Sequence, residues 1–192
     1  MKLVEAFDRY GCDKGSKKHR YDRVYEPAFE KYNREFTLLV LGIVKGHSNQ
    51  ATAADAPTRT SVGIDTFHRV PPEKIPALAM ENVGWLKASS LDKPSKEFEN
   101  LVPPGGFDII IDDGLHTHDA QRQTLENYFP YLDDGGVYFI EDIWPFDIMS
   151  PNELQHPWLR KHADDWTYAK YMALIDTASK LGTVTKHDLR AG

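Results

Sequence analysis

Residues 107–113 read FDIIIDD, a short apolar run that ends in two aspartates. Four other runs of this kind, mostly β-branched or aromatic and without strict alternation, occur at 36–41, 61–64, 83–88 and 137–140. Such runs are typical of strands in a parallel sheet that is covered on both faces. Segments with helical spacing lie between several of them. The alternation predicts an α/β fold, a doubly wound and mostly parallel sheet with helices on both faces.

Helical periodicity marks three further stretches. Apolar residues recur at three- and four-residue intervals over 21–32, where Pro27 is expected to delay or kink the helix. A second helix is expected to run through 125–132 and to stop at the glycine pair 135–136. A last helix is expected over 165–181, ahead of a glycine. The tetrapeptide SPNE, which precedes it, predicts a capping box.

Length and composition exclude several classes of protein. The chain has 192 residues, 41% of them hydrophobic, and a formal net charge of −6, so one domain over 1–192 is expected. No apolar run approaches the roughly 20 residues of a membrane span, and no secretory signal pattern opens the sequence. Cys12 is the only cysteine, which excludes a disulfide framework and favours the cytoplasm. The acidic balance makes nucleic acid a poor expectation for a partner.

Glycines and an acid follow the first two predicted strands, where ligands bind in sheets of this type. The first loop reads GIVKGHS, with Gly42 and Gly46 allowing a tight turn and Ser48 near the next helix. Asp65 follows Gly42 by 23 residues, close to the ~20-residue offset of an acid that binds ribose hydroxyls. The spacing is not G-x-G-x-x-G, which disfavours a dinucleotide. A plain strand–helix turn remains the alternative.

Three carboxylates end the fourth and fifth predicted strands. If these strands are neighbours, Asp113, Glu141 and Asp142 converge, and an all-oxygen set suits Mg²⁺. Without an ion the acids would repel one another, so removing one is expected to leave the metal-free fold as stable or more stable. His116, three residues after Asp113, is placed as a general base, with His118 as the alternative. The alternative to a metal site is that the acids cap helices and face solvent.

Three segments of the chain resemble a known family. They are YGCDKGSKKHRY at 10–21, IIIDDGLH at 109–116 and GGVYFIED at 135–142. They are similar to the class I S-adenosylmethionine- and Mg²⁺-dependent O-methyltransferases of macrolide sugars (macrocin and mycinamicin type), and cephalosporin-hydroxylase-type proteins share them. The resemblance, which covers about 7–142, implies a Rossmann-like fold. It also implies S-adenosylmethionine and Mg²⁺ as cofactors and a small-molecule hydroxyl, of a sugar or another diol, as the methyl acceptor.

The resemblance also implies roles for individual residues. Metal ligands fall at Asp113, Glu141 and Asp142, and the general base at His116. Cofactor contacts fall at Tyr10, Gly42, Gly46, Ser48, Asp65, Ser89, Ser90 and Asp112. In this set the glycine loop holds the methionine end, Asp65 the ribose and the two serines the adenine, while an N-terminal segment, 1–35, covers the cofactor. The family generally continues into another strand where this chain ends, so the sheet is expected to lack its last strand.

Several alternatives stay open. A non-catalytic cofactor-binding or assembly protein could keep this fold, since Val40 stands where the family usually has a polar glutamate. A metal-dependent hydrolase or hydroxylase could use the same acids, whereas an NAD oxidoreductase is disfavoured by the glycine spacing. An exposed sheet edge would favour a homo-oligomer. Four aromatic residues after the acids are expected in the core, with a wall of the acceptor pocket as the alternative: Trp144, Trp158, Trp166 and Tyr168.

Overall fold

The computed structural model describes residues 2–32, 35–56 and 58–189. Helices and strands alternate along most of that length, with short 3₁₀ turns between them. In chain order the elements are α1 (Leu3–Arg9), α2 (Asp22–Glu30), β1 (Phe36–Leu41), α3 (His47–Asp55), β2 (Thr58–Asp65), β3 (Val83–Lys87), α4 (Lys96–Glu99), β4 (Phe107–Asp112), α5 (His118–Tyr128), β5 (Leu132–Ile140), α6 (Pro157–Lys161) and α7 (Tyr168–Leu181).

The five strands form one parallel sheet in the order β3-β2-β1-β4-β5. Every predicted strand is present, and β2 and β5 are longer than predicted. All residues of β1 and β4 are buried, as expected of strands covered on both faces. The edge strands β3 and β5 are partly exposed. The predicted fold class is confirmed.

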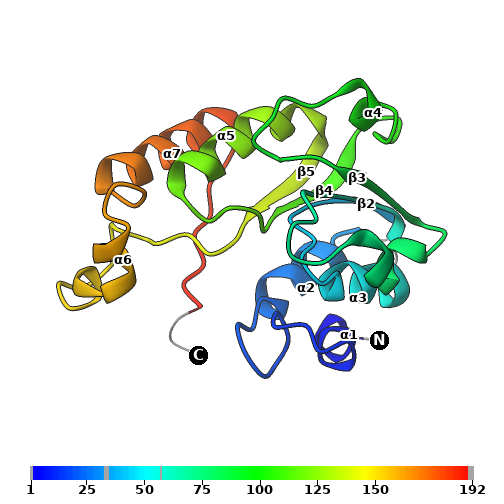
Figure 1. Cartoon of the computed structure of the whole chain (residues 1–192), viewed down its shortest axis with the longest axis horizontal. Coiled ribbons are helices and arrows are strands. Elements are labelled where there is room, and N and C mark those ends of the chain that lie inside the picture. The colour runs from blue at the N-terminus through cyan, green and yellow to red at the C-terminus, as the bar shows by residue number, and fades with distance from the viewer. Residues whose placement is uncertain (1, 33–34, 57, 190–192) are drawn as a thin grey trace.

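Helices cover both faces of the sheet (Figure 1). Successive residues of one strand point to opposite faces, so Leu38 and Leu39 of β1 belong to different core clusters. Leu38 packs with α1 and α2, including Phe7 and Tyr25. Leu39 packs with Phe98 of α4 and with the end of α5. The helix α7 packs on α5, on the same side of the sheet (Figure 1).

The structure corrects two of the predicted helices. The second predicted helix does not reach the glycine pair, because α5 ends at Tyr128 and Leu132–Ile140 is strand β5. Pro130 lacks the N–H that a continuing helix needs. The last helix begins at Tyr168 rather than at 165. Its N-cap is Thr167, whose hydroxyl accepts a hydrogen bond from the N–H of Lys170 at 3.2 Å.

The structure also tests the expectations for Pro27 and for the capping box. Pro27 lies inside α2 and does not delay its start, because the helix begins at Asp22. The predicted capping box forms with both of its bonds, since Ser150 N–H donates to Glu153 Oε2 at 2.7 Å and Glu153 N–H to Ser150 Oγ at 3.3 Å. It precedes only a 3₁₀ turn, Glu153–Gln155, rather than a long helix.

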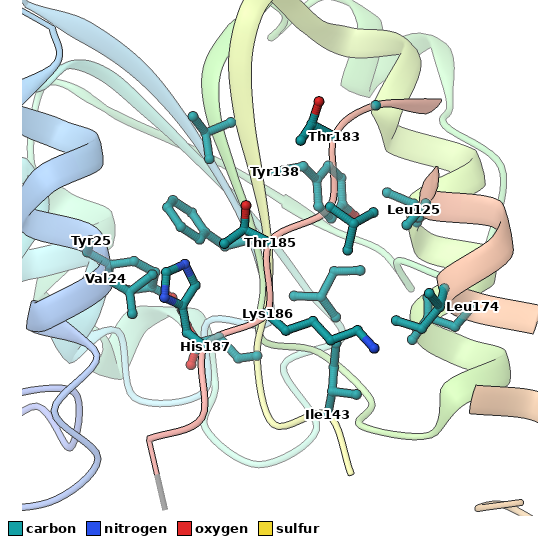
Figure 2. Close-up of a pocket in the computed structure, with 18 of the residues that line it drawn as sticks. Val24, Tyr25, Leu125, Tyr138, Ile143, Leu174, Thr183, Thr185, Lys186 and His187 are labelled. Carbon is teal, nitrogen blue, oxygen red and sulfur yellow. Dashed lines mark hydrogen bonds between the residues drawn. The ribbon is translucent and has the colours of Figure 1, made fainter. Parts of the chain in front are cut away.

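Within the described residues the sheet has five strands, and β5 is one of its two edge strands. The C-terminal segment 182–189 runs past β5 without forming a strand of its own. A cavity of about 1050 Å³ lies between this segment, β5, α5 and α7. Figure 2 shows Thr183 and Thr185 of the segment in front of β5, with Leu125 and Leu174 on the helices beside them. None of the described helices is both long and apolar enough to cross a membrane.

Candidate active site

The loop after β1 brings the first strand close to the loop after β4. Gly42 has φ +92°, and a Cβ at this position would collide with the backbone carbonyl of Asp113. Gly46 has φ +72° and precedes the first residue of α3, where a Cβ would collide with Ile75. Both positions therefore require glycine. The loop lies at the carboxyl edge of the sheet, where the predicted ligand site is expected.

Asp65 ties this loop to β2. Its carboxylate accepts hydrogen bonds from the backbone N–H groups of Ile43 at 2.8 Å, Val44 at 3.0 Å and Phe67 at 2.6 Å. The acid that the sequence singles out for its offset from Gly42 thus organises the glycine loop. It also borders the cavity described next, and its predicted contact with ribose stays a prediction.

A cavity of about 1320 Å³ opens along the carboxyl ends of the strands. Its walls come from the loops after all five strands, from 11–14 of the N-terminal segment and from the stretch between β5 and α7. Most of the residues predicted to bind the cofactor line it: Gly42, Gly46, Ser48, Asp65, Ser89 and Ser90. One concave surface therefore holds residues that are far apart in the sequence.

Two of the predicted cofactor-binding residues are not in that wall. Tyr10 packs against the core cluster that contains Leu38 of β1, while its neighbours Gly11 and Cys12 border the cavity. Asp112 is 2% exposed, and its Oδ1 accepts the N–H of Gly114 at 3.2 Å. Burial raises the pKa of Asp112 to about 7. The structure does not bring these two side chains to the cavity.

An acidic cluster borders the same cavity. Asp113, His116 and Asp142 offer side-chain ligand atoms that all lie within 4.8 Å of one another. His116 Nε2 lies 3.8 Å from Asp113 Oδ1 and 3.6 Å from Asp142 Oδ2. Asp142 adopts φ +54°, an uncommon backbone conformation for a residue other than glycine. The parallel register, in which Asp112 pairs with Ile140, places the loops after β4 and β5 side by side.

The third predicted acid, Glu141, is turned toward the protein interior. Its side chain is 2% exposed and accepts hydrogen bonds from Tyr25 OH and from the ammonium of Lys14. Burial, with a contribution from the charge of Asp113, raises the pKa of Glu141 above its ordinary value, although Lys14 opposes the shift. Glu141 thus lies beside the three clustered side chains and bonds to a different set of partners.

Lys14 is the residue that the sequence reasoning missed. Its Nζ lies 2.8 Å from Asp113 Oδ2 and also donates to Glu141. Burial opposes the charged ammonium, but the negative charges of Glu141 and Asp113 outweigh it and raise the pKa of Lys14 above its ordinary value. Lys14 stands in the matched segment 10–21, yet no local pattern links it to acids 99 and 127 residues away.

Aromatic side chains form the far wall of the cavity. Trp166 is 8% exposed, and its Nε1 donates to the backbone carbonyl of His116 at 2.8 Å. Trp158 is 46% exposed, and its ring centroid lies 4.4 Å from that of His162. Trp144 borders the cavity as well. The expectation of a core position is right for Trp166 and wrong for Trp158 and for Tyr168, which is 56% exposed.

His118, the alternative base, is excluded by its position. It is the first residue of α5, it is fully buried, and its Nε2 lies 3.2 Å from the carbonyl of Trp144. Its ring packs against Phe146 and Tyr171. Burial lowers the pKa of His118, which disfavours the protonated form. Of the two histidines, only His116 borders the cavity.

Comparison with known proteins identifies the fold and the relatives. No family model matches the chain. It is 28% identical over 149 residues to 8-demethyl-8-(2-methoxy-alpha-L-rhamnosyl)-tetracenomycin-C 3'-O-methyltransferase of Streptomyces olivaceus, which covers 71% of this chain and 35% of that protein. It is 26% identical over 150 residues to mycinamicin VI 2''-O-methyltransferase of Micromonospora griseorubida, which covers 74% and 36%.

The solved structure of MycE methyltransferase in complex with Mg, SAH and mycinamycin VI aligns with a TM-score of 0.62 and 24% identity. The alignment covers 85% of this chain and 45% of that one. The chain therefore shares the Rossmann-like fold of this methyltransferase. The chain is thus similar to O-methyltransferases that act on sugars of macrolides and related antibiotics, as the three sequence segments indicated. It spans about a third of the length of the curated relatives that it matches.

Proposed function

We propose that this chain provides the catalytic fold of an S-adenosylmethionine-dependent, Mg²⁺-assisted O-methyltransferase that acts on a hydroxyl of a sugar or similar small-molecule diol. One observation carries the proposal: a single cavity is bordered by the glycine loop, by the cluster of two aspartates and a histidine, and by exposed aromatic rings. The relatives are O-methyltransferases, which does not favour a hydrolase, a hydroxylase, an oxidoreductase or a non-catalytic protein.

The acidic cluster fits a divalent ion. Asp113 and Asp142 offer carboxylate oxygens within 4.8 Å of each other, and Glu141 follows β5 directly beside them. Oxygen ligands with room for water or substrate oxygens suit Mg²⁺. These three acids would hold the ion, as the sequence resemblance implies. When bound, Mg²⁺ lowers the pKa of a hydroxyl placed against it.

His116 is the proposed general base. Its side chain is 37% exposed, borders the cavity and faces the carboxylates of Asp113 and Asp142, so it can accept the proton of a hydroxyl placed against them. The acceptor oxygen forms a bond to the methyl carbon as the sulfonium C–S bond breaks, and S-adenosylhomocysteine leaves. The loop from Gly42 to Ser48 and Asp65 would orient the cofactor for this step.

Cofactor binding is the first test. S-adenosylhomocysteine should bind the purified protein with a micromolar Kd in titration calorimetry, and NAD should give no heat, because the first loop lacks the dinucleotide glycine spacing. A Gly46→Val variant should lose this binding, since a side chain there meets Ile75 and the φ of +72° is strained. Heat with NAD and none with S-adenosylhomocysteine would overturn the proposed function.

The acceptor is proposed to bind against the aromatic wall. Trp158 is the most exposed of the tryptophans that border the cavity, and an exposed indole face suits the apolar face of a sugar ring. In a screen of mycinamicin VI, demethylmacrocin and simple sugar diols, Trp158→Ala should raise KM for the accepted compound about tenfold, with kcat and the Kd of S-adenosylhomocysteine unchanged. Trp85→Ala, at an exposed position outside this cavity, is the control. Equal KM values in Trp158→Ala and wild type would remove Trp158 from the acceptor site.

A further inference from the structure

The N-terminal segment places a lysine side chain between two of the three acids that are proposed to bind Mg²⁺. Lys14 is 5% exposed, and its ammonium lies between two acids, 2.8 Å from Asp113 Oδ2 and hydrogen-bonded to Glu141. The ring of Tyr21 covers the same ammonium, with its centroid 5.2 Å away. A buried ammonium with two carboxylate partners is a fixed positive charge. It is held beside the acids that are proposed to bind Mg²⁺.

Two tyrosines of the same segment complete the contact. Tyr25 OH donates to Glu141 Oε1, and Tyr21 OH donates to Asp142 Oδ1 and accepts the backbone N–H of Asp142 at 3.2 Å. Together with Lys14, these side chains contact every one of the three proposed metal ligands. The position of the N-terminal segment and the charge of the acidic cluster are therefore linked.

The two carboxylate oxygens of Asp113 face different partners. Its Oδ2 bonds to Lys14 on the buried side, while its Oδ1 faces His116 on the cavity side. Glu141 offers both of its oxygens to the N-terminal segment. An ion held by Asp113 and Glu141 would therefore share two carboxylates with the ammonium. Two cations on the same carboxylates repel each other strongly in a buried site.

We propose that Lys14 is a built-in competitor of the divalent ion: it neutralises Asp113 and Glu141 in the metal-free protein and withdraws when the ion binds. The inference rests on the proposed Mg²⁺ site. Residues 11–14 border the cofactor cavity, so withdrawal of Lys14 moves part of the wall that faces the cofactor. Metal occupancy thereby sets the position of the N-terminal segment.

The affinity for Mg²⁺ tests the competition directly. Lys14→Met keeps the apolar stem and removes the charge, and it should tighten the Kd for Mg²⁺ at least tenfold in calorimetric titrations of cofactor-free protein. Lys17→Met, at an exposed position of the same segment, should bind Mg²⁺ as wild type does. An unchanged or weaker affinity in Lys14→Met overturns the inference. A wild-type protein that binds no Mg²⁺ overturns the metal site and the inference together.

A measurement on the wild-type protein needs no substitution. Lysine acetylation by acetic anhydride, read by peptide mass spectrometry, should leave Lys14 unmodified in metal-free protein because its ammonium is buried and paired. Saturating Mg²⁺ should raise the modification of Lys14 at least fivefold, with Lys17 and Lys18 unchanged. Modification of Lys14 that stays the same or falls on adding Mg²⁺ would show that the ammonium keeps its place, and it would overturn the inference.

Discussion

His116→Ala is expected to lower kcat by ~10²–10⁴-fold, which is the usual contribution of a general base. The imidazole lies 3.8 Å from Asp113 Oδ1 and 3.6 Å from Asp142 Oδ2 and borders the cavity. From there it can reach an acceptor hydroxyl placed against the acidic cluster. The deficit should shrink at high pH, where hydroxide in solution can take the proton instead. Single-turnover methyl transfer to the best acceptor of the screen, measured across pH, gives both quantities.

Binding measurements separate loss of a base from loss of the site. The Kd values of S-adenosylhomocysteine and Mg²⁺ should stay within about threefold of wild type, because the three proposed metal ligands and the glycine loop remain. His118→Ala is a poor control, since His118 is buried against Phe146 and Tyr171. His187→Gln, exposed on the C-terminal segment, should leave turnover unchanged. A His116→Ala protein with wild-type turnover would exclude His116 as the base.

The sequence predicts the sheet well because its strands carry a strong local signal. Most strands contain a short run of apolar residues, many of them β-branched or aromatic, and β1 spans the predicted residues, Phe36–Leu41. The convergence of Asp113 and Asp142 is also predictable, because acids at the carboxyl ends of neighbouring parallel strands lie at the same edge. The linear pattern does not reveal how deeply each of the three acids, Asp113, Glu141 and Asp142, is buried.

Features that depend on long-range packing could not be predicted in this way. The apolar spacing that continues from α5 into Leu132 looked helical, whereas pairing of Leu132 with Phe107 of β4 makes it strand. Trp158 and Trp166 have the same residue type and similar neighbours, yet one is half exposed and the other is buried. The partners of Lys14 lie 99 and 127 residues away, and only the folded chain brings them together.

The presence of Lys14 reverses the expectation for removal of an acid. From the sequence alone, deleting one of three repelling carboxylates should leave the metal-free fold as stable or more stable. In the structure Glu141→Ala removes the acceptor of both Lys14 and Tyr25, all three of them buried. Breaking a buried pair costs about 3–5 kcal/mol of unfolding free energy, and here Lys14 keeps only Asp113 as a carboxylate partner while the hydroxyl of Tyr25 loses its acceptor.

Asp142→Ala is the matched comparison, because this acid is adjacent in sequence but its side chain is 46% exposed. It should lower the unfolding free energy by less than about 1 kcal/mol. Both variants should lose Mg²⁺ binding. Urea denaturation in the presence of a chelator measures stability without the ion, and calorimetry measures the ion. If Glu141→Ala and Asp142→Ala are equally stable, the buried contact of Lys14 with Glu141 does not stabilise the fold. If Glu141→Ala instead exceeds the wild type in stability, repulsion among the carboxylates dominates the cluster in spite of Lys14.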